Sequence, residues 1–286
     1  MANQLSRKKK GILWGLLIIT VLLLIVSIVA YSYLNSMLNL INRDNPFATV
    51  RPEDEYFEED EGNGTGDEIN PEDVLWPDDD NGEVVRDKDI INILLIGQDR
   101  RPGEGRARSD SMMIATLNKK DKSIKITSLM RDMYLQIPGY SDNRINAAYA
   151  FGGMKLLNQT IEKNFKVHID GNVEVDFEGF MEGIDIIGGV PISITKAEAS
   201  HLNGQGFNLS AGKVNMDGKL ALAYARIRKI GNDHGRTERQ RKVIVAAFEK
   251  MKGSSISDIM SLANKVFPCI TTDLSNDQLI NLGITG

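Results

Sequence analysis

Four arginines lie between Leu222 and Gln240, in a pattern that favours binding of an anion. Arg226 and Arg228 end an alanine-rich segment of helical character, and Arg236 opens a second predicted helix after a glycine-containing loop. Because like charges repel at short range, a helix gains little from so many guanidinium groups near one turn. Guanidinium groups match phosphate oxygens in a bidentate way, and a helix N-terminus adds backbone N–H donors. The pattern therefore predicts an anion site, although a solvated basic face has the same composition.

Further charged residues stand at the ends of predicted strands. Asp99 follows an apolar strand at residues 90–97, Arg108 and Asp110 lead into the next strand, and Arg131 follows a third. In open α/β sheets ligands bind beyond the strand ends, so these loops are well placed for a site. The two aspartates together can hold Mg²⁺, which prefers oxygen ligands and bridges to substrate phosphates. Each aspartate can also simply pair with a neighbouring arginine on the surface.

The charge of the chain is unevenly distributed. Its 286 residues carry a formal net charge of −5, but residues 1–43 hold five basic residues and no acidic one. Residues 44–89 hold 18 acidic and 3 basic residues, which leaves residues 90–286 with a net charge of about +5. A cationic folded region favours an anionic partner, such as a phosphate, a nucleic acid or an anionic polymer. The single cysteine, Cys269, excludes an intramolecular disulfide.

The N-terminal region predicts a membrane anchor. A basic tail at residues 1–10 precedes an uncharged apolar run at residues 11–34, longer than the roughly 20 residues that cross a bilayer. A cleaved signal peptide would have a shorter apolar run and a clear small-residue cleavage site. We therefore expect one transmembrane helix, a cytoplasmic N-terminus and an extracellular remainder. That location argues against nucleic acid as the partner.

The remainder of the chain divides into a linker and one folded domain. Residues 35–89 are rich in acidic residues and glycine without an apolar period, so we expect an acidic flexible linker that lifts the domain off the membrane. Residues 90–286 suffice for one domain with a substantial core.

The apolar patterns of residues 90–286 predict alternating strands and helices. Strands are expected at residues 90–97, 111–117, 123–129, 133–137, 172–175 and 190–194. Helices are expected at residues 146–165, 177–187, 216–226, 236–252 and 257–266, and the capping-box spacing of Ser275 and Gln278 starts a last one. This alternation predicts a single α/β domain with a central mixed β-sheet covered by helices on both faces.

The charged segments resemble the LytR–CpsA–Psr family of Gram-positive cell-envelope proteins. The resemblance covers roughly residues 90–252, with every block in family order. The matching motifs include Asn92-Ile-Leu-Leu-Ile-Gly97-x-Asp99, Arg108-Ser-Asp110, Ser128-Leu-Met-Arg131-Asp132, Arg144-Ile-Asn146, Ile187-Gly-Gly189, Arg226-Ile-Arg228 and Gly235-Arg236-Thr-Glu-Arg-Gln240. Met130 departs from the pattern, because the family very often has proline there.

The resemblance implies a phosphotransferase that attaches an anionic glycopolymer to peptidoglycan. The polymer, such as wall teichoic acid or capsule, would leave a polyprenyl-pyrophosphate carrier, and the usual acceptor is the 6-hydroxyl of N-acetylmuramic acid. Asp99 and Asp110 are the implied Mg²⁺ ligands. They are also implied to be catalytic, together with Arg108 and Arg131. The implied pyrophosphate contacts are Arg108, Arg131, Arg226, Arg228, Arg236 and Gln240. By analogy, the helices after Asn146 and Phe177 would enclose the prenyl chain, whereas the sequence alone favours an ordinary core for their apolar faces.

The charges agree with this chemistry. Negative charge develops as a phosphoanhydride breaks, and arginines together with Mg²⁺ neutralise it where it forms. The acceptor hydroxyl must lose a proton, and Asp110 or Asp233 is the expected base. Two other interpretations stay open, a regulator that only binds polyprenyl phosphates and a pyrophosphatase that releases the head group to water. The sequence does not identify the polymer.

Overall fold

The computed structural model describes residues 7–44, 74–76, 82–98, 109–252 and 255–285. The predicted site residues Asp99 and Arg108 lie outside these residues. The chain divides into an N-terminal unit that ends at Leu40 and a larger unit that begins at Ile41. The N-terminal unit is helix α1 (Arg7–Leu38), whose segment Ile19–Leu38 is long and apolar enough to cross a membrane.

The larger unit is built on a six-stranded sheet in the order β1-β10-β7-β2-β3-β4. The strands are β1 (Asn42–Arg43), β10 (Ile270–Thr272), β7 (Gly171–Asp176), β2 (Ile90–Gln98), β3 (Ser109–Asn118) and β4 (Ser123–Leu129). Strand β2 is parallel to β7 and antiparallel to β3, and β3 is antiparallel to β4. The C-terminal ends of β2, β4 and β7 therefore meet the N-terminal end of β3 at one edge of the sheet.

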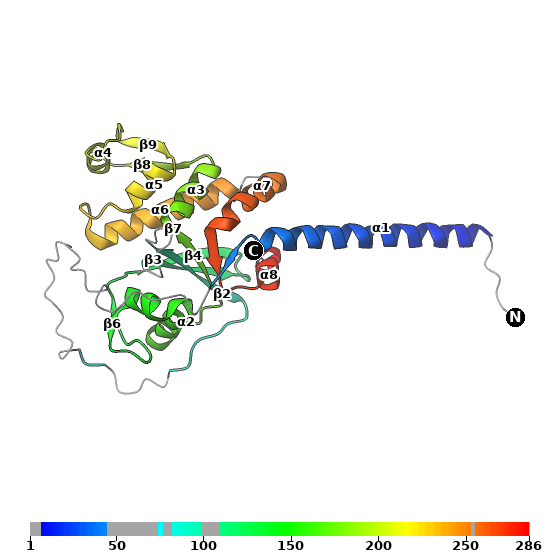
Figure 1. The fold of residues 1–286 in the computed structure, drawn as a ribbon, viewed down its shortest axis with the longest axis horizontal. Coiled ribbons are helices and arrows are strands. Elements are labelled where there is room, and N and C mark those ends of the chain that lie inside the picture. Colours follow the sequence, from blue (N-terminus) through cyan, green and yellow to red (C-terminus); the bar gives the residue numbers. More distant parts are fainter. Residues whose placement is uncertain (1–6, 45–73, 77–81, 99–108, 253–254, 286) are drawn as a thin grey trace. The chain divides into compact units, whose positions relative to one another are not determined.

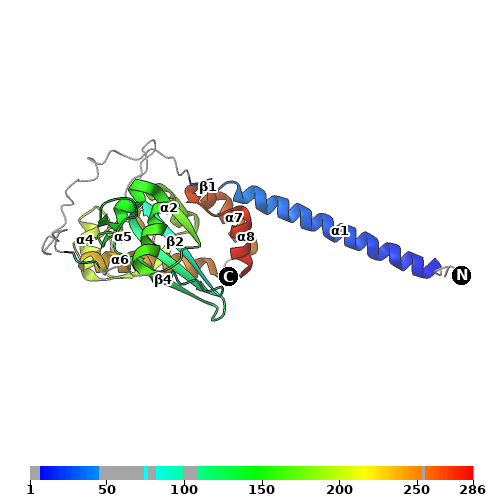
Figure 2. The ribbon, with the colours of Figure 1, turned by 90° about the horizontal axis from the view of Figure 1, so that it is seen from below.

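Helices cover both faces of this sheet, which confirms the predicted fold class (Figure 1). Helix α2 (Ile145–Phe165) lies on one face and is in front of β2 when the molecule is seen from below (Figure 2). Helices α3 (Phe177–Ile186), α5 (Gly218–Ala225) and α6 (Asn232–Lys252) lie on the other face. Because side chains alternate along a strand, Leu94 and Ile96 of β2 pack into the core under α2.

A second core forms beyond the α3–α5–α6 layer. The predicted strand at residues 190–194 exists as β8 (Val190–Ile194), but it pairs with β9 (Gly212–Met216) in a small sheet of its own. Helix α4 (Lys196–Asn203) and strand β9 were not predicted. Burial of Val190, Leu202 and Met216 against α5 and α6 ties this small sheet to the domain.

Several predicted boundaries were wrong. The expected strand at residues 133–137 is only β5 (Tyr134–Leu135), which pairs with β6 (Asn143–Arg144) outside the central sheet. Helix α5 begins after Met216 because Asp217 caps it, accepting a hydrogen bond from the backbone of Leu220 at 2.8 Å.

The C-terminal elements follow the sequence pattern more closely. They are α7 (Ile256–Val266), the 3₁₀ turn η3 (Phe267–Cys269) and α8 (Asn276–Thr285). The capping box before α8 is confirmed, with Ser275 N–H donating to Gln278 Oε1 at 2.8 Å and Gln278 N–H to Ser275 Oγ at 3.3 Å.

The start of the predicted linker belongs to the folded domain. Asn42 and Arg43 pair in parallel with β10, and Arg43 donates hydrogen bonds to the Leu274 carbonyl and to Asn276. Helix α1 also continues to Leu38, beyond the predicted end at residue 34. The pairing covers an edge of β10 that would otherwise expose unpaired backbone groups. Most of the predicted linker, residues 45–73 and 77–81, lies outside the described residues.

Close packing of α5 on α3 generates the first prediction. A Cβ at Gly218 would lie 2.1 Å from the backbone oxygen of Met181, whereas a Cβ at Gly183 in α3 would meet nothing within 4 Å. Gly218→Ala should destabilise the protein by about 1–3 kcal/mol through overpacking. The control Gly183→Ala should stabilise it by about 0.5–1 kcal/mol, because alanine suits a helix interior. Thermal unfolding followed by near-UV circular dichroism measures both, and equal melting temperatures would contradict the packing.

Candidate active site

A cavity of about 470 Å³ lies between the central sheet and the layer of α3, α5 and α6. Its volume falls within the roughly 300–1,000 Å³ typical of small-molecule sites. Most of the lining is apolar and comes from both layers: Leu95, Met113, Val173, Val175, Phe177, Phe180, Leu222, Ala225, Val243 and Ile244. The polar lining residues are Asp110, Ser111, Arg226, Arg228, Arg236 and Gln240. An apolar interior with charged groups in its wall suits an amphipathic ligand with an anionic head.

The helices of the cavity wall differ from those expected. We expected the helices after Asn146 and Phe177 to enclose a chain, and the described lining includes α3, which begins at Phe177, but no residue of α2. Helix α2 instead packs its apolar face into the core on the opposite side of the sheet, with Ala148 and Leu157 fully buried. The other helices that line the cavity are α5 and α6.

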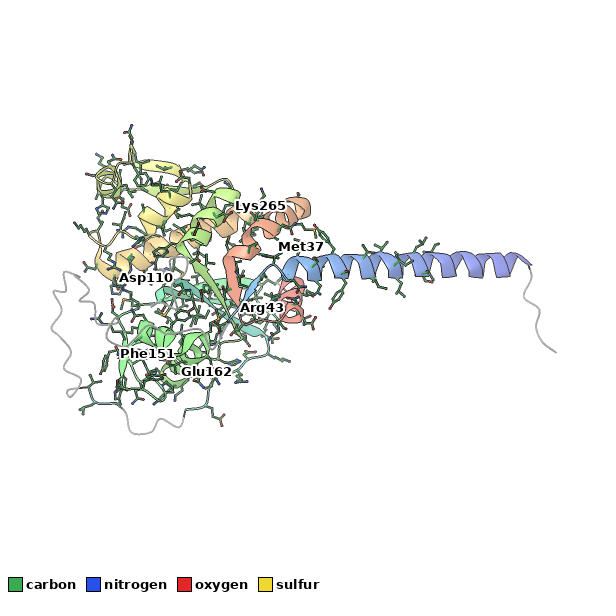
Figure 3. All side chains as sticks on the ribbon, in the orientation of Figure 1. Met37, Arg43, Asp110, Phe151, Glu162 and Lys265 are labelled. Atoms are coloured by element: carbon green, nitrogen blue, oxygen red, sulfur yellow. The ribbon has the colours of Figure 1, made fainter. Side chains whose placement is uncertain are left out.

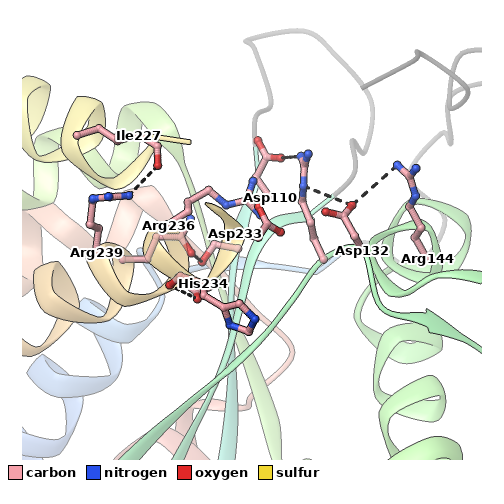
Figure 4. Close-up of polar contacts among 12 residues, drawn as sticks. Asp110, Asp132, Arg144, Ile227, Asp233, His234, Arg236 and Arg239 are labelled. Atoms are coloured by element: carbon pink, nitrogen blue, oxygen red, sulfur yellow. Dashed lines mark hydrogen bonds and ion pairs between the residues drawn. The ribbon is translucent and has the colours of Figure 1, made fainter. Parts of the chain in front are cut away.

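A row of alternating charges runs across the edge where the strands end (Figure 4). Arg131, which follows β4, donates from Nη1 to Asp110 Oδ1 at 2.8 Å, and its Nε lies 3.7 Å from Asp132 Oδ1. Asp132 in turn lies 3.8 Å from Nη1 of Arg144 in β6. Arg131 is only 9% exposed, so its charge acts in a partly desolvated setting.

The first turns of α6 bring a second cation to the same place. Arg236 is 3% exposed, and its Nη2 lies 3.1 Å from Asp233 Oδ2. Burial lowers the pKa of Arg236, and the nearby cations Arg131 and Arg228 lower it further. These guanidinium groups therefore repel one another, and a bound dianion would relieve that repulsion. Gln240, one turn further along α6, accepts a hydrogen bond from Ser111 of β3 at 3.2 Å.

A buried ion pair fixes the loop that carries Arg226 and Arg228. Arg239 of α6 is 4% exposed; its Nε lies 2.8 Å from Glu198 Oε1, and its Nη1 donates to the Ile227 carbonyl at 2.9 Å. Burial would raise the pKa of Glu198, but hydrogen bonds from Thr195 and Arg239 outweigh it and lower that pKa. Arg239 thus holds the backbone between α5 and α6.

Arg226 has a further contact inside this arrangement. Its guanidinium carbon lies 4.7 Å from the ring centroid of Phe177, the first residue of α3. This cation–π contact joins the loop between α5 and α6 to the start of α3.

Two carboxylates meet beside the arginines. Burial raises the pKa of Asp132, the cation of Arg131 opposes that shift, and the charge and hydrogen bond of Asp233 raise the pKa again. Asp132 therefore binds a proton at a higher pH than an ordinary aspartate. Its side chain is still 41% exposed, so a ligand from solvent can reach it.

The described predicted residues converge on one place. Asp110, Arg226, Arg228, Arg236 and Gln240 line the cavity, and Arg131 reaches it through Asp110.

Other parts of the site were not predicted from the sequence. They are Ser111, Phe180 and the Glu198–Arg239 pair. The capping-box spacing from Thr195 to Glu198 was a usable signal for α4 and thereby for the buried glutamate.

Comparison with known proteins gives a consistent result. The model of the LytR_cpsA_psr family matches residues 55–285. A protein of Oceanobacillus iheyensis named polyisoprenyl-teichoic acid–peptidoglycan teichoic acid transferase TagU is 37% identical over 209 residues. That match covers 70% of this chain and 64% of the relative, so the chain spans slightly less than two thirds of that protein.

Solved structures also resemble the domain. The crystal structure of B. subtilis TagT has a TM-score of 0.57 and 29% identity, covering 69% of this chain and 74% of that one. A LytR-CPS2A-psr family protein, YwtF (TagT), with bound octaprenyl pyrophosphate lipid, has a TM-score of 0.54 and 28% identity. That match covers 69% of this chain and 73% of the other.

The mutual repulsion of the cations generates a second prediction. Inorganic pyrophosphate should raise the melting temperature, because a ligand that binds only the native state stabilises it. Arg228→Gln should reduce this increase by more than half, since Arg228 lines the cavity. Lys229→Gln removes the same charge from an exposed neighbour outside the described lining and should leave the increase unchanged. Differential scanning calorimetry at low ionic strength measures all three, and equal losses in both variants would contradict a localised site.

Proposed function

The chain belongs to the LytR–CpsA–Psr family, and from this we propose that it transfers an anionic glycopolymer from a polyprenyl-pyrophosphate carrier to peptidoglycan. The observation that carries the proposal is the apolar cavity with cations in its wall. A polyprenyl pyrophosphate has a matching division, with a long apolar tail and a doubly charged head. The name of the TagU relative and the lipid bound to YwtF (TagT) support the same chemistry.

We propose that the prenyl tail occupies the apolar interior between β2, β3, β7 and the helices α3, α5 and α6. The pyrophosphate would then meet Arg226, Arg228, Arg236 and Gln240 in the polar wall, with Arg131 beside them. Arginine suits this role because its planar donors contact phosphate oxygens in pairs. The lowered pKa of Arg236 supports it, since partly desolvated cations gain most from an anionic ligand.

The donor chemistry of the site fits a Mg²⁺ ion. Asp110 lines the cavity, its side chain is about a quarter exposed, and its Oδ1 accepts a hydrogen bond from Arg131. Mg²⁺ often takes one or two carboxylates and completes its shell with substrate phosphates and water. Asp110 would hold it, with Asp99 as the second expected ligand. When bound, the ion would neutralise charge on the phosphate oxygens.

The remaining chemistry is assigned to this chain's own residues. As the phosphoanhydride breaks, the leaving prenyl phosphate gains negative charge, and Arg131, Arg228 and Arg236 would stabilise it. The bond formed joins the acceptor oxygen to the sugar-linked phosphorus, and the hydroxyl proton must go to a base. We assign that proton to Asp132, because burial and, to a smaller extent, Asp233 raise its pKa and make it a better base than an ordinary aspartate.

We further propose that α1 anchors the protein in the cell membrane, with the basic N-terminus in the cytoplasm and the domain outside. The basic residues 7–10 support this orientation, because positive charge flanking a membrane span favours the cytoplasmic side. The polyprenyl carrier and peptidoglycan would then be accessible on the same side of the membrane as the domain.

A transfer assay with the full chain tests the function. Detergent-solubilised protein, a lipid-pyrophosphate-linked saccharide, peptidoglycan and Mg²⁺ should give a covalent saccharide–peptidoglycan product, detected by mass spectrometry after digestion. Asp110→Asn and Arg236→Gln should each lower the rate about 10²–10³-fold, the usual cost of removing one group that stabilises a transition state. Asp121→Asn, at an exposed turn away from the cavity lining, should leave the rate unchanged.

The same assay distinguishes the two rival functions. Lipid binding without product in any variant would establish a regulator that captures the carrier. Phosphate-capped saccharide formed equally well without peptidoglycan would establish a pyrophosphatase. Either result would contradict the proposed transferase function.

The pKa of Asp132 generates a pH prediction. The transfer rate should fall on acidification as Asp132 becomes protonated, with a midpoint above the roughly 3.9 of an ordinary aspartate. Asp132→Asn should lower the rate at pH 7 and remove this acid limb. The same variant should be more stable than the parent at pH 7, and the difference should shrink as pH falls. A raised native pKa makes the parent lose stability as pH rises through it. An unchanged acid limb in the variant would exclude Asp132 as the base.

A further inference from the structure

The β5–β6 hairpin connects the charged row to a group of aromatic side chains. Tyr134 of β5 pairs directly with Arg144 of β6, so the two side chains project from the same face of the hairpin. Arg144 is the residue that contacts Asp132 at 3.8 Å. The aromatic group therefore begins beside the row that leads through Arg131 to Asp110.

Two stacked pairs make up this group. Trp76 stacks on Tyr134 with ring centroids 6.5 Å apart and planes 13° apart, and its Nε1 donates to Asp142 Oδ2 at 2.5 Å. Tyr140, only two residues before Asp142, stacks on Phe151 of α2 at 4.9 Å and 18°. We call Trp76, Tyr134, Tyr140, Phe151, Asp142 and Arg144 the aromatic ledge.

The ledge keeps aromatic surface in contact with solvent. Tyr140 is 47% exposed although its ring is already stacked, and Trp76 and Tyr134 are only partly buried. Helix α2 is interrupted directly after Phe151, where Gly152 and Gly153 adopt non-helical angles and φ of Gly153 is +63°. Gly153 reaches this left-handed conformation without the strain that a Cβ would add.

We propose that the aromatic ledge binds the sugar chain of the acceptor. This inference rests on the proposed function, and it specifies where the second substrate lies. Pyranose rings present flat C–H faces that pack on aromatic rings, while their hydroxyl and amide groups need hydrogen-bonding partners at the edges. The ledge offers both, because Asp142 and Arg144 lie next to the rings of Trp76 and Tyr134. Arg144 also suits the carboxylate of a muramic acid residue.

The aromatic ledge and the proposed lipid site occupy different regions, so the acceptor and the lipid-linked donor can bind at the same time. The cavity lies on the sheet face covered by α3, α5 and α6, whereas Phe151 belongs to α2 on the other face (Figure 3). The two regions meet at the edge of the sheet through Arg131, which bonds Asp110, and Asp132, which contacts Arg144 (Figure 4). A sugar on the ledge would thus present its hydroxyl to Asp132, while the phosphates stay beside Asp110.

The chain offers a direct reporter for this site, because Trp14 and Trp76 are its only tryptophans. In the full-length Trp14→Phe variant in detergent micelles, all tryptophan emission comes from Trp76. Soluble peptidoglycan glycan strands without peptide stems should shift this emission in a saturable way. Dextran, an α-linked glucan without amino sugars or carboxylates, should not.

Tyr140→Ala in the same background should weaken glycan binding about tenfold or more, the usual effect of removing an aromatic anchor. Phe248→Ala removes a ring of the same 47% exposure from α6, outside the described ledge, and should leave binding unchanged. Near-UV circular dichroism and the melting temperature establish that both variants are folded. An unshifted emission, an unaffected Tyr140→Ala variant, or equal losses in both variants would overturn the proposal.

Binding of octaprenyl pyrophosphate, measured on the same samples, separates this inference from the proposed function. If transfer and lipid binding are both observed but the glycan does not change the Trp76 emission, the proposed glycan site is wrong and the proposed transferase function is retained. If the glycan shifts the Trp76 emission and Tyr140→Ala weakens this effect, but no transfer occurs, the aromatic ledge is a glycan-binding site and the proposed transferase function is wrong.

Discussion

The position of Arg226 and Arg228 depends on one buried ion pair. Arg239 and Glu198 are both nearly inaccessible, and the guanidinium also bonds the carbonyls of Ile227 and Ile230. Substituting one member of such a pair leaves an uncompensated buried charge, which destabilises a protein by about 3–5 kcal/mol. The backbone that carries Arg226 and Arg228 is thus held by an arginine that has no place in the described cavity lining. The sequence presents these arginines as one cluster, but the fold divides them into residues that line the cavity and one, Arg239, that fixes the loop between α5 and α6.

Several neighbouring cations repel one another, and the nearby carboxylates only partly offset this unfavourable electrostatic free energy. Arg131 bonds Asp110 and Arg236 bonds Asp233, yet burial and the neighbouring cations still lower the pKa of Arg236. Sites that concentrate like charge are commonly less stable than they could be, and the ligand recovers the difference on binding. This unrelieved repulsion between partly buried cations is the physical reason to treat these residues as a site. The ions of an exposed surface pair would instead be solvated by water.

Sequence patterns predicted elements with a strong local signal and missed those that depend on distant partners. Strand β4 was predicted at residues 123–129 because its apolar residues alternate with polar ones, whereas β1 and β10 have only two and three residues and depend on pairing with each other and, for β10, also with β7. The start of α6 was placed too late because Gly235 was interpreted as loop. Gly235 is needed for another reason, because a Cβ at this position would lie 2.7 Å from the carbonyl oxygen of Ile230. The aromatic ledge had no local signal, because its rings come from three separate segments.

The topology of the sheet explains why residues so far apart in sequence form one site. Strand β2 is parallel to β7, and two antiparallel steps bring β4 into the same direction as β2. Arg131 after β4, Phe177 after β7 and Asp110 at the start of β3 therefore meet at one edge. The cavity lies on the face of α3, α5 and α6, and the hairpin of β5 and β6 packs on α2 on the other face. The proposed two-substrate transfer would use both regions, because both reactants must be held together while the phosphate passes between them.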